Sequence, residues 1–262
     1  MPAAEVYKGD HWSVVNSIAH LTSSIEIKIW IASAGYGLIS PASHIVPYAA
    51  TFSPRHEDSV ANSSSERRAW WAGVTKTPPE SHPNTPRSLR AVARKHKTSP
   101  LIIAASPEYI DAMADDILAA QKQLDSSDLL SILCRRGAAP EELKASSIAL
   151  QADFSTSLGG ALTSLNARVL RWLVLQECEM LTTTAITKLL SGLALRSKAR
   201  TIPKRTRLTD TEVKEQIRVA FERSEEVSRT SALRALRDSG LAVEQRRFAR
   251  IYNEVRAEAE LG

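Results

Sequence analysis

Three short apolar runs, each followed by a loop and then by a segment of helical periodicity, constrain the fold of this chain most. The first is residues 24–33, where isoleucines alternate with Glu26 and Lys28. The second is residues 100–105 and the third is residues 129–134. Strand, loop and helix recurring in this order predict a parallel sheet with helices packed on it. We therefore expect an α/β fold, specifically a three-layer α/β/α sandwich with a mostly parallel central sheet.

Signals for helix starts lie beside these runs. Asp10 is placed to cap a helix within residues 12–21, and Ser106-Pro107 marks the start of a helix after the second run. A further helical segment is expected from near Pro140, after the third run. In such sheets ligands bind where strands end, so the loops after the three runs are expected to share one pocket.

The chain divides by composition into three parts. Residues 1–197 hold the sheet and its covering helices, residues 198–208 form a basic linker, and residues 209–262 form a helical module. In that module Thr209 and Glu212 form a capping box. Two helices then follow, separated by Ser239-Gly240-Leu241, which is the helix-turn-helix outline. An ordinary helical hairpin has the same pattern.

Positive charge is unevenly distributed, although the net charge of +5 is mild. Clustered cations attract a polyanion by releasing its counterions. Solvated surface charge is the alternative interpretation. The side chains predicted to contact DNA are Arg87, Arg90, Arg94, Lys95, Lys204, Arg205, Arg246, Arg247 and Arg250.

Other classes of protein are disfavoured by what the sequence lacks. No apolar run approaches the roughly 18 residues needed to span a bilayer, and the N-terminus has no export signal pattern, so we expect a cytoplasmic protein without membrane contact. Cys134 and Cys178 are expected to be reduced packing residues. The six histidines lack metal-ligand spacing, and no cofactor motif is present.

The least ordinary segment, residues 31–60, follows the first run. Gly35 and Gly37 flank Tyr36, where glycine permits close approach of the backbone to a ligand. Aromatic rings among hydroxyls and carboxylates suit a planar, hydrogen-bonding ligand such as a nucleobase. Anchoring of a long loop by its aromatic side chains is the alternative. The predicted base-binding residues are Ser33, Tyr36, Tyr48, Thr51, Ser53 and, later in the chain, Asn166.

The chain resembles a bacterial and phage protein family in five short segments. These are the runs SAGYGLI and VPYAATFS, the earlier segment Tyr7-Lys8-Gly9, and the later segments Leu158-Gly159-Gly160 and Ser164-Leu165-Asn166. That family is often labelled as related to tRNA-guanine transglycosylases. The chain also looks like the uracil-DNA-glycosylase type of sandwich, and by context like phage-defence DNA glycosylases that excise modified bases. The resemblance covers residues 7–60 and 100–175. The chain lacks the Gln-Asp-Pro-Tyr loop and the His-Pro-Ser segment of the uracil-DNA-glycosylase type. The mechanism of that type therefore does not transfer to this chain residue by residue.

The resemblance implies a DNA glycosylase that acts in anti-phage defence, flips a modified base out of the duplex and leaves an abasic site. Cleaving the base–sugar bond needs a carboxylate near the developing positive charge on the sugar. Asp58 and Asp153 are the catalytic candidates, although either residue would equally serve as a helix cap. The alternatives are a noncatalytic DNA-binding or regulatory protein whose α/β domain binds a nucleotide, and a transglycosylase that exchanges a base in RNA. The oligomeric state is left open.

Overall fold

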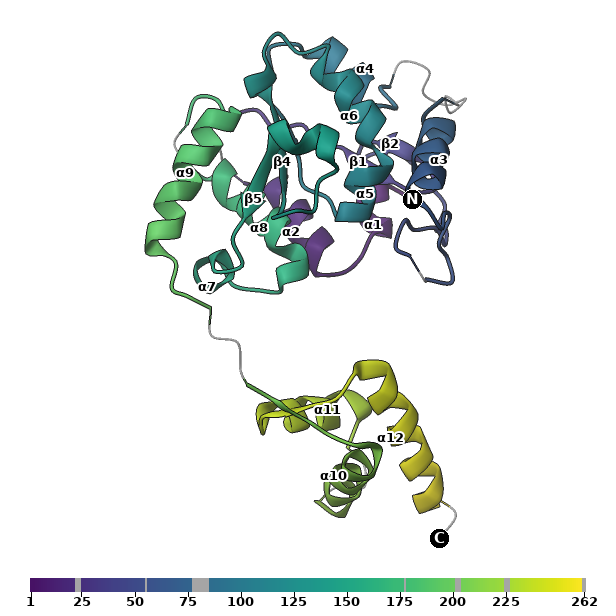
Figure 1. Cartoon of the computed structure of the whole chain (residues 1–262). Coiled ribbons are helices and arrows are strands. Elements are labelled where there is room, and N and C mark those ends of the chain that lie inside the picture. The colour runs from purple at the N-terminus through teal and green to yellow at the C-terminus, as the bar shows by residue number, and fades with distance from the viewer. Residues whose placement is uncertain are drawn as a thin grey trace. The chain divides into compact units, whose positions relative to one another are not determined.

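The chain forms two compact units, Met1–Arg200 and Thr201–Gly262, each described here by itself (Figure 1). The structure is a computed structural model and describes residues 1–21, 25–54, 56–76, 85–176, 178–200, 204–223 and 227–260. The first unit is mixed α/β, and the second contains three longer helices and one short pair of strands.

A small parallel sheet lies at the centre of the first unit. Its strands are β3 (Leu101–Ile103), β4 (Leu130–Arg135) and β5 (Ser147–Leu150), in the order β3-β4-β5. Leu101 pairs with Leu130, and Ile132 pairs with Ser147, both in parallel. The second and third apolar runs therefore form strands of one parallel sheet, as predicted, and the structure makes them neighbours in it. The helix expected from near Pro140 is wrong, because only the 3-10 segment η2 (Glu141–Ser146) precedes the edge strand β5.

Side chains of β4 alternate between two separate cores. Leu130, Ile132 and Cys134 belong to one cluster, whereas Leu133 belongs to the other. Ser131, between Leu130 and Ile132 in the strand, is 1% exposed, and its hydroxyl bonds to the Thr183 hydroxyl at 2.8 Å. A strand whose successive side chains point to opposite faces can serve two cores in this way.

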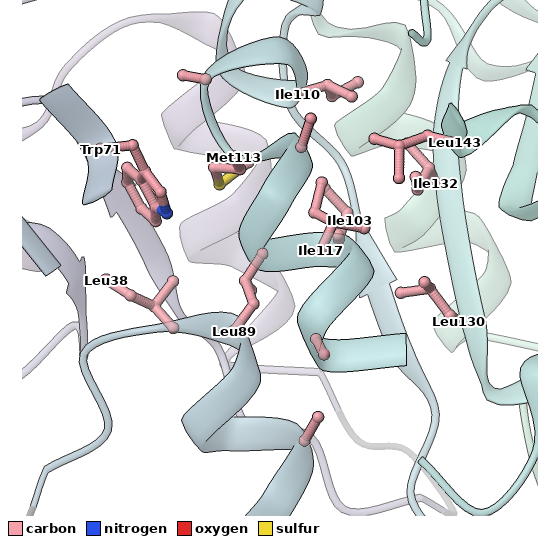
Figure 2. Close-up of a cluster of buried hydrophobic side chains, with 14 of the residues drawn as sticks. Leu38, Trp71, Leu89, Ile103, Ile110, Met113, Ile117, Leu130, Ile132 and Leu143 are labelled. Atoms are coloured by element: carbon pink, nitrogen blue, oxygen red, sulfur yellow. The ribbon is translucent and has the colours of Figure 1, made fainter. Parts of the chain in front are cut away.

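The first core, shown in Figure 2, lies under helices from the middle of the chain. These helices are α3 (Ser64–Lys76), α4 (Leu89–Lys95), α5 (Pro107–Ala112) and α6 (Ala114–Gln121). The second core is covered by α2 (Asp10–Ile18), α7 (Phe154–Leu158), α8 (Leu165–Val174) and α9 (Thr183–Arg196). The other short elements here are α1 (Ala3–Val6), η1 (Ser127–Leu129) and η3 (Leu162–Ser164).

The first apolar run does not join the parallel sheet. Only its end forms a strand, β1 (Ile31–Ser33), which pairs antiparallel with β2 (Gly37–Ile39) as a separate hairpin. Gly37 has φ +70°, which lets the chain reverse within a few residues. Ile25, Ile27 and Ile29 pack against the second core without strand pairing among the described residues.

Two predicted helix starts differ in detail. Asp10 is the first residue of α2 rather than its cap, since Gly9 occupies the cap position. Pro107 does open α5, although the Ser106 side chain makes no cap bond. Of the adjacent tryptophans, Trp71 is 2% exposed and Trp70 is 41% exposed.

The second unit packs three helices around its own core. They are α10 (Asp210–Arg223), α11 (Arg229–Asp238) and α12 (Gln245–Glu260). Thr209 and Glu212 form the predicted capping box, in which Thr209 N and Oγ1 donate to Glu212 Oε2 at 2.7 and 2.8 Å. The connection between α11 and α12 is more than a turn, because β7 (Leu241–Ala242) pairs in parallel with β6 (Thr206–Arg207). Within the described part of the chain, no helix combines the length and the apolar character needed to cross a bilayer.

Candidate functional site

Three hydroxyl groups from distant segments meet just past β1. Ser33 Oγ lies 2.5 Å from Tyr48 Oη, which lies 2.9 Å from Tyr7 Oη. Ser33 is 1% exposed, so its hydroxyl depends on protein partners rather than on water. We call Tyr7, Ser33, Tyr36 and Tyr48 the tyrosine cluster.

Glycine allows the rings of this cluster to approach the hairpin turn. A Cβ atom added at Gly35 would lie 2.7 Å from two ring carbons of Tyr48, so the ring packs directly on this backbone. The Tyr36 ring meets the Tyr48 ring edge-on, with centroids 5.1 Å apart. Tyr36 N also donates to Ser33 Oγ at 3.1 Å. The predicted residues Ser33, Tyr36 and Tyr48 therefore lie together.

Burial changes the acidity of two phenols here. It raises the pKa of Tyr7, and it raises the pKa of Tyr109 in the first turn of α5. Tyr48 lies close enough to both phenols to raise their pKa values further. Tyr7 and Tyr109 therefore stay protonated at neutral pH and can donate hydrogen bonds.

A second polar group lies at the end of β3. Asn166 Nδ2 donates to Ala105 O at 3.0 Å, and the side chain of Asn166 neighbours His11. Burial lowers the pKa of the His11 imidazole, although Asn166 and then Asp10 oppose part of this effect. His11 is thus held close to its neutral form, which has one donor and one acceptor nitrogen.

An arginine connects the start of α2 to the start of α8. Arg168 Nη2 donates to Asp10 Oδ1 at 2.6 Å, and Ser164 Oγ donates to Asp10 Oδ2. The hydrogen bond from Ser164 lowers the pKa of Asp10 the most, and the bond from Arg168 lowers it further, so Asp10 is ionised. The Arg168 side chain runs across Gly160, where any Cβ would overlap it. We call Asp10, Ser164 and Arg168 the α2–α8 clamp.

The His11–Asn166 pair and the clamp lie at the beginnings of α2 and α8, and Tyr7 of the tyrosine cluster precedes α2 by three residues. Helix N-termini carry partial positive charge and favour anionic groups. Tyr7, Asp10, His11, Ser164, Arg168 and Tyr109 were not predicted as site residues. Of these, only Tyr7 and Ser164 belong to segments singled out in the sequence, Tyr7-Lys8-Gly9 and Ser164-Leu165-Asn166. Asp10, next to the first segment, accepts a hydrogen bond from Ser164 of the second.

The two predicted catalytic carboxylates lie in different surroundings. Asp58 is joined to the neighbourhood of the tyrosines through Thr51, because Thr51 N donates to Asp58 O at 3.0 Å and the Thr51 side chain neighbours Tyr109. Asp153 instead accepts from Arg200 N at 3.0 Å, at the end of the first unit. No hydrogen bond or ion pair among the described residues joins the two aspartates.

Neither aspartate caps a helix through its side chain. Asp58 lies well before α3, which begins at Ser64, and its carboxylate lies 3.5 Å from His56 Nδ1. Asp153 occupies the cap position of α7 without a side-chain cap bond. Ser53 is exposed and donates its backbone N–H to Thr51 Oγ1 at 3.1 Å.

The predicted DNA-contacting cations fall into two groups. Arg87 is directed into the protein, where Nη2 donates to Tyr36 O at 2.6 Å and Val74 O at 2.9 Å, and burial lowers its pKa. Arg247 and Arg250 are both paired with Asp210, with Arg250 Nη2 at 2.8 Å. These three arginines are therefore bonded within the protein and do not form an unpaired basic surface. The remaining predicted cations have exposed side chains, namely Arg90, Arg94, Lys95, Lys204, Arg205 and Arg246.

Two hollows in the described surface have no lining residue from the tyrosine cluster, although Trp70 of the first donates to Ala34 O beside Ser33. One is lined by Val60, Glu66, Trp70 and other residues of α3, and one lies between β5 and α9. Among the described residues, no group of three or more His, Cys, Asp or Glu side chains is placed to hold a metal ion. Cys134 and Cys178 are free thiols.

Comparison of the chain with protein-family models, curated proteins and solved structures gives no match.

We predict that His11 makes stability depend on pH. Because its pKa is lower when folded, the unfolded chain takes up the proton first as pH falls through about 6.5. The free energy of unfolding should therefore decrease between pH 7.5 and pH 5.5. His11→Gln should show a smaller decrease in urea titrations at these two pH values. Equal decreases in both proteins would contradict this assignment.

Proposed function

We propose that this chain is a DNA glycosylase that removes a modified base from DNA, in a cytoplasmic setting of defence against phage. In the same proposal, its sheet and covering helices form a three-layer α/β/α sandwich, and residues 209–262 form a nucleic-acid-binding module. The observation that carries the proposal is the tyrosine cluster at the end of β1, whose Tyr7 ring contacts Trp12 in the first turn of α2 with centroids 5.6 Å apart. His11, in the same turn, neighbours Asn166. Aromatic faces beside donors and acceptors match the chemistry of an extruded base.

The hydrolysis breaks the bond between the sugar carbon and the base nitrogen. The base departs with the electron pair and takes a proton, while water adds to the sugar carbon and loses one. Phenol and imidazole groups that are neutral donors suit the departing base, and an ionised carboxylate suits the sugar. We assign the carboxylate role to Asp58, because its backbone carbonyl accepts from Thr51 N and the Thr51 side chain neighbours Tyr109, whereas Asp153 lies beside Arg200. Asp10 acts as a positioning residue through the α2–α8 clamp.

The test is incubation of the purified chain with phage DNA that carries modified bases and with unmodified DNA. Release of free base, together with alkali-labile abasic sites, is expected only with the modified DNA. Binding without release would overturn the proposal in favour of a noncatalytic DNA-binding protein. Incorporation of a labelled base into RNA would instead favour a transglycosylase.

Matched carboxamide variants test the carboxylate assignment. Asp58→Asn is expected to lower base release by about 100-fold, the size found when one charge-stabilising group is removed from an active site. Asp153→Asn serves as the control and is expected to retain release, since its side chain contacts only Arg200 N among the described residues. Loss of release in the Asp153 variant alone would overturn this assignment while leaving the glycosylase activity established.

A further inference from the structure

Two surfaces of the second unit that carry cations differ in electrostatic character. On the surface between α10 and α12, basic and acidic side chains neutralise one another. Arg250 pairs with both Asp210 and Glu254, at 2.8 and 2.6 Å. The other pairs of this surface are Arg247–Asp210, Lys214–Glu254, Lys214–Glu258 and Arg218–Glu258. Here four cations face three carboxylates.

The surface formed by α11 and β6 has a different composition. We call Lys204, Arg205, Arg207, Arg234 and Arg237 the α11 face. Four of these side chains are exposed, and that of Arg237 is half-buried. Among the described residues, no carboxylate forms an ion pair with any of them.

Backbone contacts bring the members of the α11 face together. Thr206 N donates to Gly240 O at 3.0 Å, which holds β6 beside the end of α11. Arg205 Nε then donates to Arg237 O at 3.1 Å. Arg234 and Arg237, three positions apart, lie on the same side of their helix. The cations of β6 are thus held beside the end of α11, and Arg234 and Arg237 lie in the half of that helix nearest this end.

We propose that the α11 face binds the phosphate backbone of double-stranded DNA, and that the paired arginines of α12, Arg247 and Arg250, do not. Each phosphate contact releases condensed counterions, and a cation that already has a carboxylate partner must give up that partner first. This inference takes its choice of partner from the proposed function. Because it concerns the second unit, binding to unmodified DNA tests it without any base release.

The experiment compares two double variants of the full chain that remove equal charge. In Arg207→Gln with Arg234→Gln, two unpaired cations are lost, and binding to a labelled unmodified duplex should weaken by about tenfold at 0.2 M salt. The slope of log K against log[salt] should become shallower by about two. In Arg247→Gln with Arg250→Gln, both affinity and slope should stay close to those of the unaltered chain.

Thermal melting of both variants identifies any effect of misfolding. The proposal would be overturned if the Arg247/Arg250 double variant bound DNA more weakly while the Arg207/Arg234 double variant bound it normally. Unchanged binding by both variants would do the same. Because base release from single-stranded modified DNA is measured separately, a failure here is distinguishable from a failure of the glycosylase proposal.

Discussion

Replacing Tyr48 with alanine is expected to slow base release from modified DNA by about 10- to 100-fold. Stacking of a base on an aromatic ring contributes about 1–3 kcal/mol, and Tyr48 is the ring that joins the other members of the tyrosine cluster. Tyr48→Phe keeps the ring and removes the hydroxyl that bonds to Ser33 and Tyr7. It should therefore retain most of the stacking contribution. Single-turnover measurements of release separate the two variants.

A change at Gly35 tests the same ring without altering it. Gly35→Ala introduces a Cβ 2.7 Å from the Tyr48 ring and should displace it, at a cost of about 1–3 kcal/mol in the free energy of unfolding. Gly73→Ala is the matched control, since its Cβ would meet no atom within 4 Å inside α3. It should stabilise the chain by about 0.5–1 kcal/mol. Release at the original rate by both Tyr48→Ala and Gly35→Ala would remove Tyr48 from the site.

The largest expected effect on stability is that of Trp71→Ala. Trp71 is 2% exposed in the first core (Figure 2), and large-to-small changes of a buried aromatic residue cost about 3–5 kcal/mol. The change also removes the bond from Trp71 Nε1 to Asp116 at 3.1 Å. Asp116 would keep its bonds to the backbone N–H groups of Leu89 and Arg90, so α4 should remain anchored.

Trp70→Ala provides the comparison for this measurement. Trp70 is adjacent in sequence but 41% exposed, and its main polar contact is a 2.7 Å bond to Ala34 O. Its loss should cost about 1 kcal/mol, the net contribution of a typical hydrogen bond. Guanidinium unfolding of the two variants decides the matter. Equal destabilisation of the two variants would contradict the prediction that the buried Trp71 contributes more to stability than the exposed Trp70.

Local patterns predicted the fold where they were long enough to be distinctive. Residues 100–105 and 129–134 were correctly predicted as parallel strands, and the Thr209 capping box was correctly predicted as a helix start. The four residues of β5 are too few to show a period, and they follow serines and a 3-10 segment. The antiparallel pairing of β1 depends on a turn at Gly37, which the alternation of isoleucines does not reveal.

The candidate site was predicted in part for a similar reason. Ser33, Tyr36 and Tyr48 lie within one segment, so their proximity follows from the chain itself. The contacts of Asp10 with Ser164 and Arg168 join residues over 150 positions apart, and no single-sequence pattern shows such contacts. The pairing of Arg247 and Arg250 could not be predicted from the sequence, because the carboxylate that neutralises them, Asp210, belongs to a different helix.

Successive side chains of β4 belong to two different cores, and this arrangement fixes the register in which the strand pairs. If the strand slipped by one position against β3, Ser131 would enter the apolar cluster around Ile117, and Ile132 would face the Thr183 hydroxyl. Both misplacements are unfavourable, one through an unsatisfied hydroxyl and one through lost apolar contact. Alignment of the whole sheet is thereby encoded in a single six-residue strand.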